Sequence, residues 1–100
     1  MKSRYEISEL AIQDLEGIWQ FSVGNWSVKQ ANKYYELLIE AIEQICKFPQ
    51  IGKSIESIKK HHRMYQVKSH LIIYKIIDDF IWVDRILHQR MDIVTRLEDK

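Results

Sequence analysis

The spacing of apolar residues changes from a helical period in the first half of the chain to a strand pattern in the second. Residues 2–7 alternate between polar and apolar side chains, which predicts a short N-terminal strand. Apolar residues then recur every three or four positions in two segments, from the N-cap candidate Ser8 to the Gly-Asn pair at 24–25 and from the N-cap candidate Ser27 to the Phe-Pro pair at 48–49. We expect these two amphipathic helices to pack as an antiparallel hairpin.

Extra apolar residues broaden the stripe of the first helix, so we expect both of its faces to be partly buried. They are Leu10, Ile12, Phe21 and Val23. In the second helix, Tyr34 and Tyr35 fall within the apolar stripe, and packing explains them better than base stacking. Trp26 lies in the turn between the helices and is expected to be partly exposed.

Three segments rich in Ile, Val, Tyr and Trp follow a basic loop at residues 49–60, which has no periodicity. Residues 63–68, 71–77 and 80–87 are separated by pairs of residues, which predicts consecutive antiparallel hairpins. The middle and last strands are almost continuously apolar, so we expect both of their faces to be largely covered. The Asp-Asp pair at 78–79 lacks glycine, and we expect a longer or bulged connection there.

The C-terminal segment adds a short and loosely held helix, in which Asp92 caps a turn that contains Val94 and Leu97. The predicted fold class is α+β, with an N-terminal strand and an antiparallel helical hairpin packed on an antiparallel sheet that ends in a three-strand meander. We expect so small a sheet to leave its other face, or one edge, open for a partner.

The composition is that of one packed domain spanning residues 1–100, since 46% of the residues are hydrophobic and only three are Gly and one is Pro. No apolar run approaches the roughly 20 residues of a membrane span, and the polar start lacks a signal core. The lone Cys46 excludes an internal disulfide, which is typical of the reducing cytosol. We therefore expect a cytoplasmic protein with no membrane contact.

The net charge of +1 hides a basic segment at residues 52–75, where six basic residues face the single acid Glu56. The basic residues are Lys53, Lys59, Lys60, Arg63, Lys68 and Lys75. Such a segment is either a solvated face or a surface that attracts an anionic partner, either nucleic acid or an acidic protein.

No motif predicts a metal or cofactor site. Side chains of the adjacent His61 and His62 are expected on opposite sides of a strand, and no His pair has the helical spacing of zinc ligands. The glycines are scattered, so no phosphate-binding loop is expected. Cys46 adjoins Ile42 and Ile45 and is interpreted as a small core residue rather than a nucleophile. We expect neither metal nor cofactor.

Basic and histidine residues of the three C-terminal strands form the remaining candidate cluster, since strand reversal brings such positions together. The cluster comprises Arg63, Tyr65, Lys68, His70, Arg85, His88 and Arg90. It could neutralise a phosphate, with His88 as the acid or base. The structural interpretation is favoured, because no second carboxylate or tyrosine matches: Arg85 would pair with Asp84, Asp92 or a helix carboxylate, and His88 and Arg90 would fix the last strand to the tail.

Two segments resemble the ParE branch of the RelE/ParE superfamily, the toxins of type II toxin–antitoxin modules. They are Ser-His-Leu-Ile-Ile-Tyr-Lys at residues 69–75 and, above all, Arg-Ile-Leu-His-Gln-Arg-Met-Asp at residues 85–92. The likeness also includes the Asp-Leu-Glu-Gly-Ile-Trp helix at 14–19 and the Phe-Pro-Gln-Ile-Gly break at 48–52. It covers nearly the whole chain, and the family fold agrees with the predicted meander.

The resemblance implies a small cytoplasmic toxin that a ParD-like antitoxin holds inactive in a hetero-oligomer. ParE toxins are associated with poisoning DNA gyrase, which implies a toxin that binds its target and is not an enzyme. RelE-type relatives instead cut messenger RNA in the ribosome. Here Leu71 stands where RelE-like sequences carry an arginine, and no tyrosine follows Tyr74. If the chain were such a ribonuclease, its candidate catalytic residues would be Arg63, His88 and Arg90. A third possibility is an inactive remnant that still pairs with an antitoxin.

An acidic and apolar antitoxin tail would suit the open sheet face, with nearby basic residues steering its approach. We expect this face to be edged by Lys53, Lys59, Lys60 and Arg63. The candidate residues for antitoxin or target binding are Lys53, Lys59, Lys60, Arg63, Lys68, Arg85, His88 and Arg90.

Overall fold

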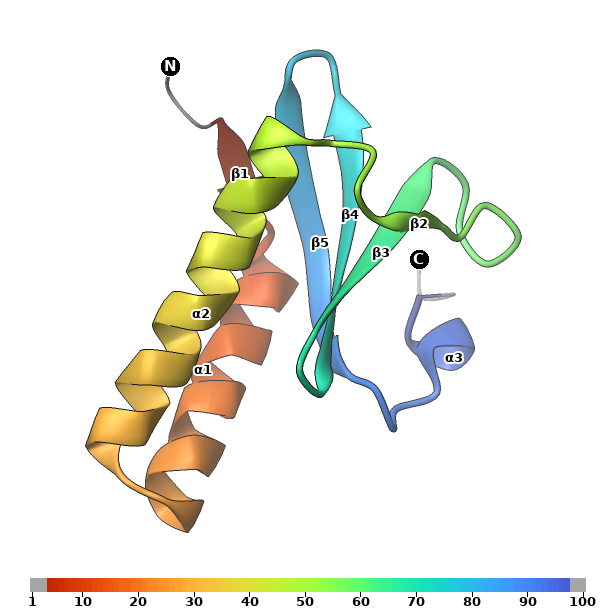
Figure 1. Cartoon of the computed structure of the whole chain (residues 1–100). Coiled ribbons are helices and arrows are strands. Elements are labelled where there is room, and N and C mark those ends of the chain that lie inside the picture. The colour runs from red at the N-terminus through yellow and green to blue at the C-terminus, as the bar shows by residue number, and fades with distance from the viewer. Residues whose placement is uncertain (1–3, 98–100) are drawn as a thin grey trace.

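The computed structural model describes residues 4–97 and has the predicted α+β class (Figure 1). Its elements are β1 (Tyr5–Ile7), α1 (Glu9–Asn25), α2 (Val28–Lys47), β2 (Lys53–Ser54), β3 (His62–Val67), β4 (His70–Ile77), β5 (Phe80–His88) and α3 (Ile93–Leu97). The sheet order is β1-β5-β4-β3-β2, with β1 parallel to β5 and all other pairs antiparallel. The start of the predicted first strand, residues 2–3, lies outside the described residues.

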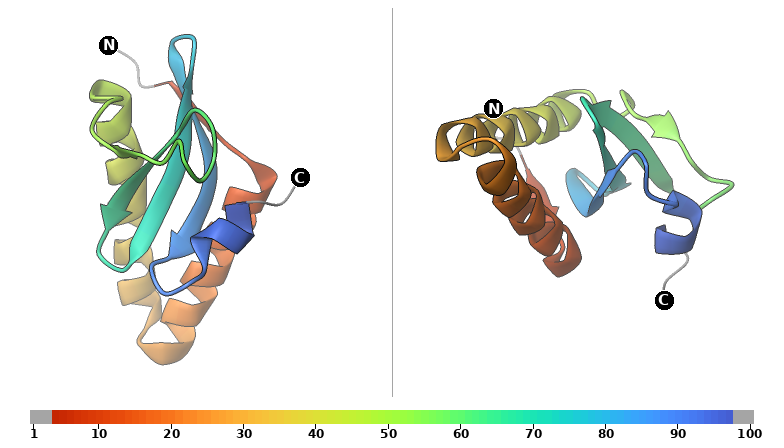
Figure 2. Two further views of the ribbon diagram at one scale, coloured as in Figure 1. Left: turned by 90° about the vertical axis from the view of Figure 1, so that its right-hand side faces the viewer. Right: turned by 90° about the horizontal axis from the view of Figure 1, so that it is seen from below.

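Both predicted serine N-caps are confirmed. The Ser8 hydroxyl accepts a hydrogen bond from the Ala11 amide, and the Ser27 hydroxyl accepts one from the Gln30 amide. Each cap satisfies a backbone N–H that has no partner within its helix. The two helices form the predicted antiparallel hairpin, which covers one face of the sheet (Figures 1 and 2).

The main core lies between this hairpin and the sheet, where Leu38 and Ile42 of α2 pack with Ile72 and Tyr74 of β4. The buried Tyr74 hydroxyl donates to the carbonyl of Pro49 and accepts from the amide of Gly52. A Cβ at Gly52 would lie 2.5 Å from that hydroxyl oxygen, so only glycine fits beside it. Tyr74 thereby fixes the chain that leaves α2.

The second face of the sheet is covered as well, so the prediction of an open sheet face is wrong. Leu71, Ile73 and Leu87 are buried against Ile55 and Leu97. These two residues come from the loop after β2 and from α3, which lie against the side of the sheet away from the hairpin (Figure 2). The apolar residues of the aperiodic segment 49–60 serve this packing, which periodicity cannot reveal.

The short C-terminal helix is confirmed, since the Asp92 carboxylate accepts hydrogen bonds from the amide and hydroxyl of Thr95. Leu97 is only 3% exposed, so this helix is anchored by its apolar contact and not loosely held.

The expected long or bulged connection at Asp78-Asp79 is wrong, because Ile77 pairs directly with Phe80 across a two-residue turn. Asp78 adopts a φ of 51°, a conformation that aspartate tolerates better than most residues.

The bulge lies elsewhere, between Ile73 and Tyr74 of β4, where Asp84 is the unpaired residue of β5.

The expectation that both faces of α1 are partly buried is also wrong. Leu10, Ile12 and Phe21 are 49%, 45% and 62% exposed. A helix in a two-layer fold buries one stripe, and the remaining apolar residues stay on the surface. Among the described residues, no helix is long and apolar enough to span a membrane.

Candidate functional site

The basic candidate residues predicted from the sequence are divided among several separate contacts. The Lys59 ammonium lies 2.8 Å from the Asp84 carboxylate, and Nε2 of the buried His62 lies 3.3 Å from the same oxygen. The hydrogen bond from His62, together with the Lys59 ion pair, holds the pKa of Asp84 well below its usual range despite its burial. The Lys59 charge is therefore engaged within the protein.

Arg63 is also held internally, because its guanidinium donates to the carbonyl of Gly52 and to the side-chain oxygen of Gln50. Arg63 pairs across the sheet with Tyr74, whereas His88 pairs with His70, four residues further along β4. That step is about 13 Å at the rise of a strand. The structure does not bring Arg63 together with His88 and Arg90.

Arg85 forms a two-pronged ion pair with Asp14 of α1, at 2.9 and 3.0 Å. The same carboxylate accepts the amide of Ile86. Pairing with a helix carboxylate was one of the structural alternatives for Arg85, and it joins α1 to β5. Tyr65 packs against the main core, whereas Lys53, Lys60, Lys68 and Arg90 are exposed.

Lys68, His70 and His88 do lie around one cavity, at the end of the sheet beside the tip of the helical hairpin. They line a cavity of about 610 Å³, here called the histidine pocket. Its lining residues are Ile18, Phe21, Ser22, Trp26, Gln30, Tyr34, Lys68, Ser69, His70, His88 and Met91. No acidic side chain is among these lining residues.

The polar part of the histidine pocket is a contact of three rings. The Tyr34 hydroxyl lies 2.7 Å from Nδ1 of His70, and the His70 and His88 rings meet edge to face with centroids 5.1 Å apart. Burial, followed by the nearby His88, lowers the pKa of His70 to about 4, so His70 is neutral at pH 7. Burial likewise raises the pKa of Tyr34. Nδ1 of His88 accepts the amide of Arg90, which turns the chain after β5.

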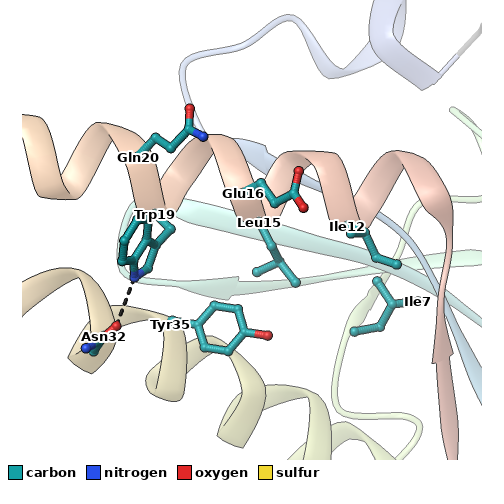
Figure 3. A pocket seen from close by; sticks show the side chains of 8 residues that line it. All are labelled: Ile7, Ile12, Leu15, Glu16, Trp19, Gln20, Asn32 and Tyr35. Carbon is teal, nitrogen blue, oxygen red and sulfur yellow. Dashed lines mark hydrogen bonds between the residues drawn. The ribbon is translucent and has the colours of Figure 1, made fainter. Parts of the chain in front are cut away.

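A second cavity of about 840 Å³ lies in the seam between α1 and α2 and is closed at one end by β1 (Figure 3). This hairpin groove is lined by Ile7, Ile12, Leu15, Glu16, Trp19, Gln20, Asn32 and Tyr35. The Trp19 indole donates a 2.9 Å hydrogen bond to the Asn32 side chain across the seam (Figure 3). Glu16 is the one charged lining residue.

The sequence interpretation missed the hairpin groove, although a signal was present. Ile12 and Tyr35 lie outside the buried stripes of their helices and are 45% and 43% exposed. Apolar residues beyond the width that one buried stripe needs indicate a second apolar surface. The expectation that Tyr35 belongs to the core is therefore wrong, while Trp26, at 68% exposure, is exposed as expected.

Within residues 4–97, no group of three or more His, Cys, Asp or Glu side chains is placed to hold a metal ion. The Cys46 thiol is partly buried against the main core and lies 3.5 Å from the carbonyl of Arg4. Burial raises the pKa of this thiol, which disfavours the nucleophilic thiolate.

Comparison with known proteins identifies first the fold and then the family. A solved chain described as "Chromosomal ParDE TA system from P. aeruginosa" matches with a TM-score of 0.75, covering 86% of this chain and 95% of that one. At 16% sequence identity, this match shows a shared fold.

The family follows from the sequence. The family model for the ParE toxin of type II toxin–antitoxin systems (parDE) matches residues 5–93. Toxin ParE1 of Mycobacterium tuberculosis is 37% identical over 94 residues, which cover 93% of this chain and 96% of the relative. Toxin ParE1 of Caulobacter vibrioides is 33% identical over 88 residues, covering 88% and 91%. The chain belongs to the ParE toxin family of type II toxin–antitoxin systems.

Proposed function

We propose that this ParE toxin acts in the cytoplasm by inhibiting DNA gyrase, and that a ParD-like antitoxin neutralises it in a hetero-oligomer. The proposal rests on the family match over residues 5–93 together with a surface built for binding. The observation that carries it is the hairpin groove, where apolar side chains from both helices stay exposed around a cavity of about 840 Å³.

The antitoxin is proposed to lay an apolar segment into the hairpin groove. Ile12, Trp19 and Tyr35 would supply the contact area, and aromatic residues of this kind carry much of the binding energy in protein interfaces (Figure 3). This assignment replaces the covered sheet face as the antitoxin's site. The exposed Lys53 and Lys60 are left to steer an acidic partner, since Lys59 and Arg63 are held by internal contacts.

Titration of the antitoxin against substituted toxins tests this assignment. Ile12→Ala and Tyr35→Ala together are expected to weaken antitoxin binding by about tenfold or more, as removal of interface anchors does. Leu10→Ala is the matched control, because Leu10 is similarly exposed on α1 but does not line the groove. Unchanged affinity in the double variant would exclude the groove as the antitoxin's site.

The separation of Arg63 from the other ribonuclease candidates favours a toxin that binds rather than cleaves. Phosphodiester cleavage needs a proton-transfer group and a cation at the same phosphate, and Arg63 cannot be that cation beside His88, because it is tied to Gln50 and Gly52, about 13 Å along the strands from the level of His88.

Purified toxin added to gyrase is expected to inhibit supercoiling, and the same protein added to translating ribosomes is expected to leave messenger RNA intact. Antitoxin added in excess should restore supercoiling. RNA cleavage with normal supercoiling would instead identify a ribosome-dependent endoribonuclease.

A further inference from the structure

The histidine pocket is a second apolar surface of the toxin, and the proposed antitoxin contact leaves it unused. Building on the proposed function, we propose that this pocket binds the protein target of the toxin. The occupant is an apolar side chain of the target that is followed closely by a carboxylate. The antitoxin and the target would then contact different surfaces of the toxin.

The rim of the pocket exposes aromatic rings at the tip of the helical hairpin. Phe21 and Trp26 are 62% and 68% exposed, and their rings meet edge to face with centroids 6.2 Å apart. Met91, 39% exposed, adds a flexible apolar side chain from the other side of the pocket. Held rings of this kind offer a large contact area at little cost in side-chain entropy, which is typical of residues that anchor protein interfaces.

The floor of the pocket suits an uncharged group. His70 is neutral at pH 7 and already shares a short hydrogen bond with the Tyr34 hydroxyl. An unpaired charge covered by a partner would oppose binding. A side chain that fills the space above the His70 and Tyr34 rings covers no such charge. A cavity of about 610 Å³ is within the size range of ligand pockets and has ample room for a large side chain.

The charge of the pocket indicates what accompanies that side chain. Lys68 is exposed and lines the pocket. None of the lining residues is acidic. In the hairpin groove the sign is reversed, since Glu16 is its only charged lining residue. A segment that carries a carboxylate beside its apolar anchor is favoured in the histidine pocket and disfavoured in the groove.

The two cavities also use different sides of the same helix. Ile12, Glu16 and Trp19 of α1 line the groove, whereas Ile18, Phe21 and Ser22 line the histidine pocket. With 3.6 residues per turn, the mean directions of these two sets differ by about 130°. One variant can therefore alter one surface and leave the other intact.

Two substitutions and their matched controls test the inference on the full chain. Trp26→Ala removes the exposed ring at the C-cap of α1, and its control is Phe48→Ala, which removes an exposed ring at the C-cap of α2. Lys68→Asn removes the charge at a residue with a φ of 55°, where asparagine fits well, so folding is preserved. Its control is Lys33→Asn, which removes the charge of an exposed lysine on α2 that lines neither cavity.

Each variant is measured for three properties: binding to purified gyrase, growth arrest when expressed without antitoxin, and binding to the antitoxin. Trp26→Ala is expected to weaken gyrase binding by about tenfold or more, and Lys68→Asn by about threefold to tenfold. Both should arrest growth less than the controls do, while all four proteins bind the antitoxin within about twofold of the original chain. Antitoxin binding thus reports that each variant is folded.

Gyrase binding and growth arrest equal to those of the controls would overturn the inference, as would an equal loss of antitoxin binding. If the original toxin arrests growth without binding gyrase, the proposed gyrase target fails, and the histidine pocket is then judged by growth arrest alone. An original toxin that neither arrests growth nor binds gyrase overturns both proposals.

Discussion

The hairpin groove and the histidine pocket flank the same helix, yet their polar groups are held very differently. The groove is formed almost entirely by the helical hairpin, and its one cross-seam hydrogen bond, from Trp19 to Asn32, is exposed. The histidine pocket joins the hairpin to the β3–β4 turn and to the end of β5, and its Tyr34–His70 hydrogen bond is partly buried. Burial makes polar contacts expensive to break, so the pocket should be the more rigid of the two surfaces.

This difference suits different kinds of partner. A seam of exposed apolar side chains can accept segments that vary in detail, because apolar contact is not directional. A pocket with a fixed polar floor and one cation at its rim discriminates by shape and charge. Substitutions that remove a polar contact from each surface therefore test whether the histidine pocket is more rigid than the hairpin groove.

The largest expected effect is at the ion pair that fixes α1 beside the histidine pocket. Asp14→Ala removes the two-pronged ion pair with Arg85 and the acceptor of the Ile86 amide, where both charged side chains are about 15% exposed. Losing these partly buried contacts together should lower the free energy of unfolding by about 3 kcal/mol, measured by urea denaturation.

Glu16→Ala is the control for Asp14→Ala, since Glu16 lies on the same helix but is exposed on the groove side. It should change the stability by no more than about 0.5 kcal/mol. Equal effects at the two positions would show that the two sides of α1 are held with the same strength.

Local sequence signals predicted the elements of the fold well, because they depend on a few neighbouring residues. Ser8 and Ser27 cap their helices as predicted, and the three consecutive strands lie within one residue of their expected bounds. What escaped prediction depends on distant contacts. The cover over the second sheet face comes from Ile55 and Leu97, whose partners Leu71 and Leu87 lie at least ten residues away.

The candidate site was predictable only in part, for the same reason. Strand reversal correctly placed His70 beside His88, since adjacent strands fix that register. The sequence could not show that Lys59 would pair with Asp84 or that Arg63 would donate to Gly52, because these contacts depend on the path of a loop. It also assigned Tyr34 only to packing, whereas its hydroxyl completes the floor of the histidine pocket.

The next largest effect concerns the pH dependence of the histidine pocket. His70 has a pKa of about 4 in the folded protein, below the ordinary value of 6.5 expected in the unfolded chain. Burial is the main cause of this low pKa, followed by the neighbouring His88, whereas Asp14 acts in the opposite direction. Since the unfolded state binds the proton first, stability is fully present above pH 6.5 and falls as the pH is lowered toward 4.

Thermal denaturation between pH 7.5 and pH 4 measures this loss, which should be on the order of 2 kcal/mol for His70 after allowance for its partial exposure. His70→Gln retains an acceptor for the Tyr34 hydroxyl and cannot titrate, so its stability should fall less over the same range. Parallel curves for the two proteins would mean that His70 is not desolvated and that the pocket floor is open to water.

A smaller effect is expected for the hydrogen bond between Tyr34 and His70. Tyr34→Phe keeps the ring and removes the hydroxyl that lies 2.7 Å from Nδ1 of His70. Losing one partly buried hydrogen bond should cost about 1 kcal/mol in urea denaturation. Tyr35→Phe, on the exposed side of the same helix, should cost less than half as much. A reversed order would contradict the difference in rigidity.

The smallest effect is expected in the hairpin groove. Asn32→Ala removes the acceptor of the Trp19 indole, but this hydrogen bond is exposed, so water can replace the lost partner (Figure 3). The stability should change by about 0.5 kcal/mol or less, because alanine is also the better helix former. Hydrogen exchange of the Trp19 indole N–H, followed by NMR, should already be fast in the original protein. Slow exchange, or a cost above about 1.5 kcal/mol in urea denaturation, would show that the groove is as tightly fixed as the histidine pocket.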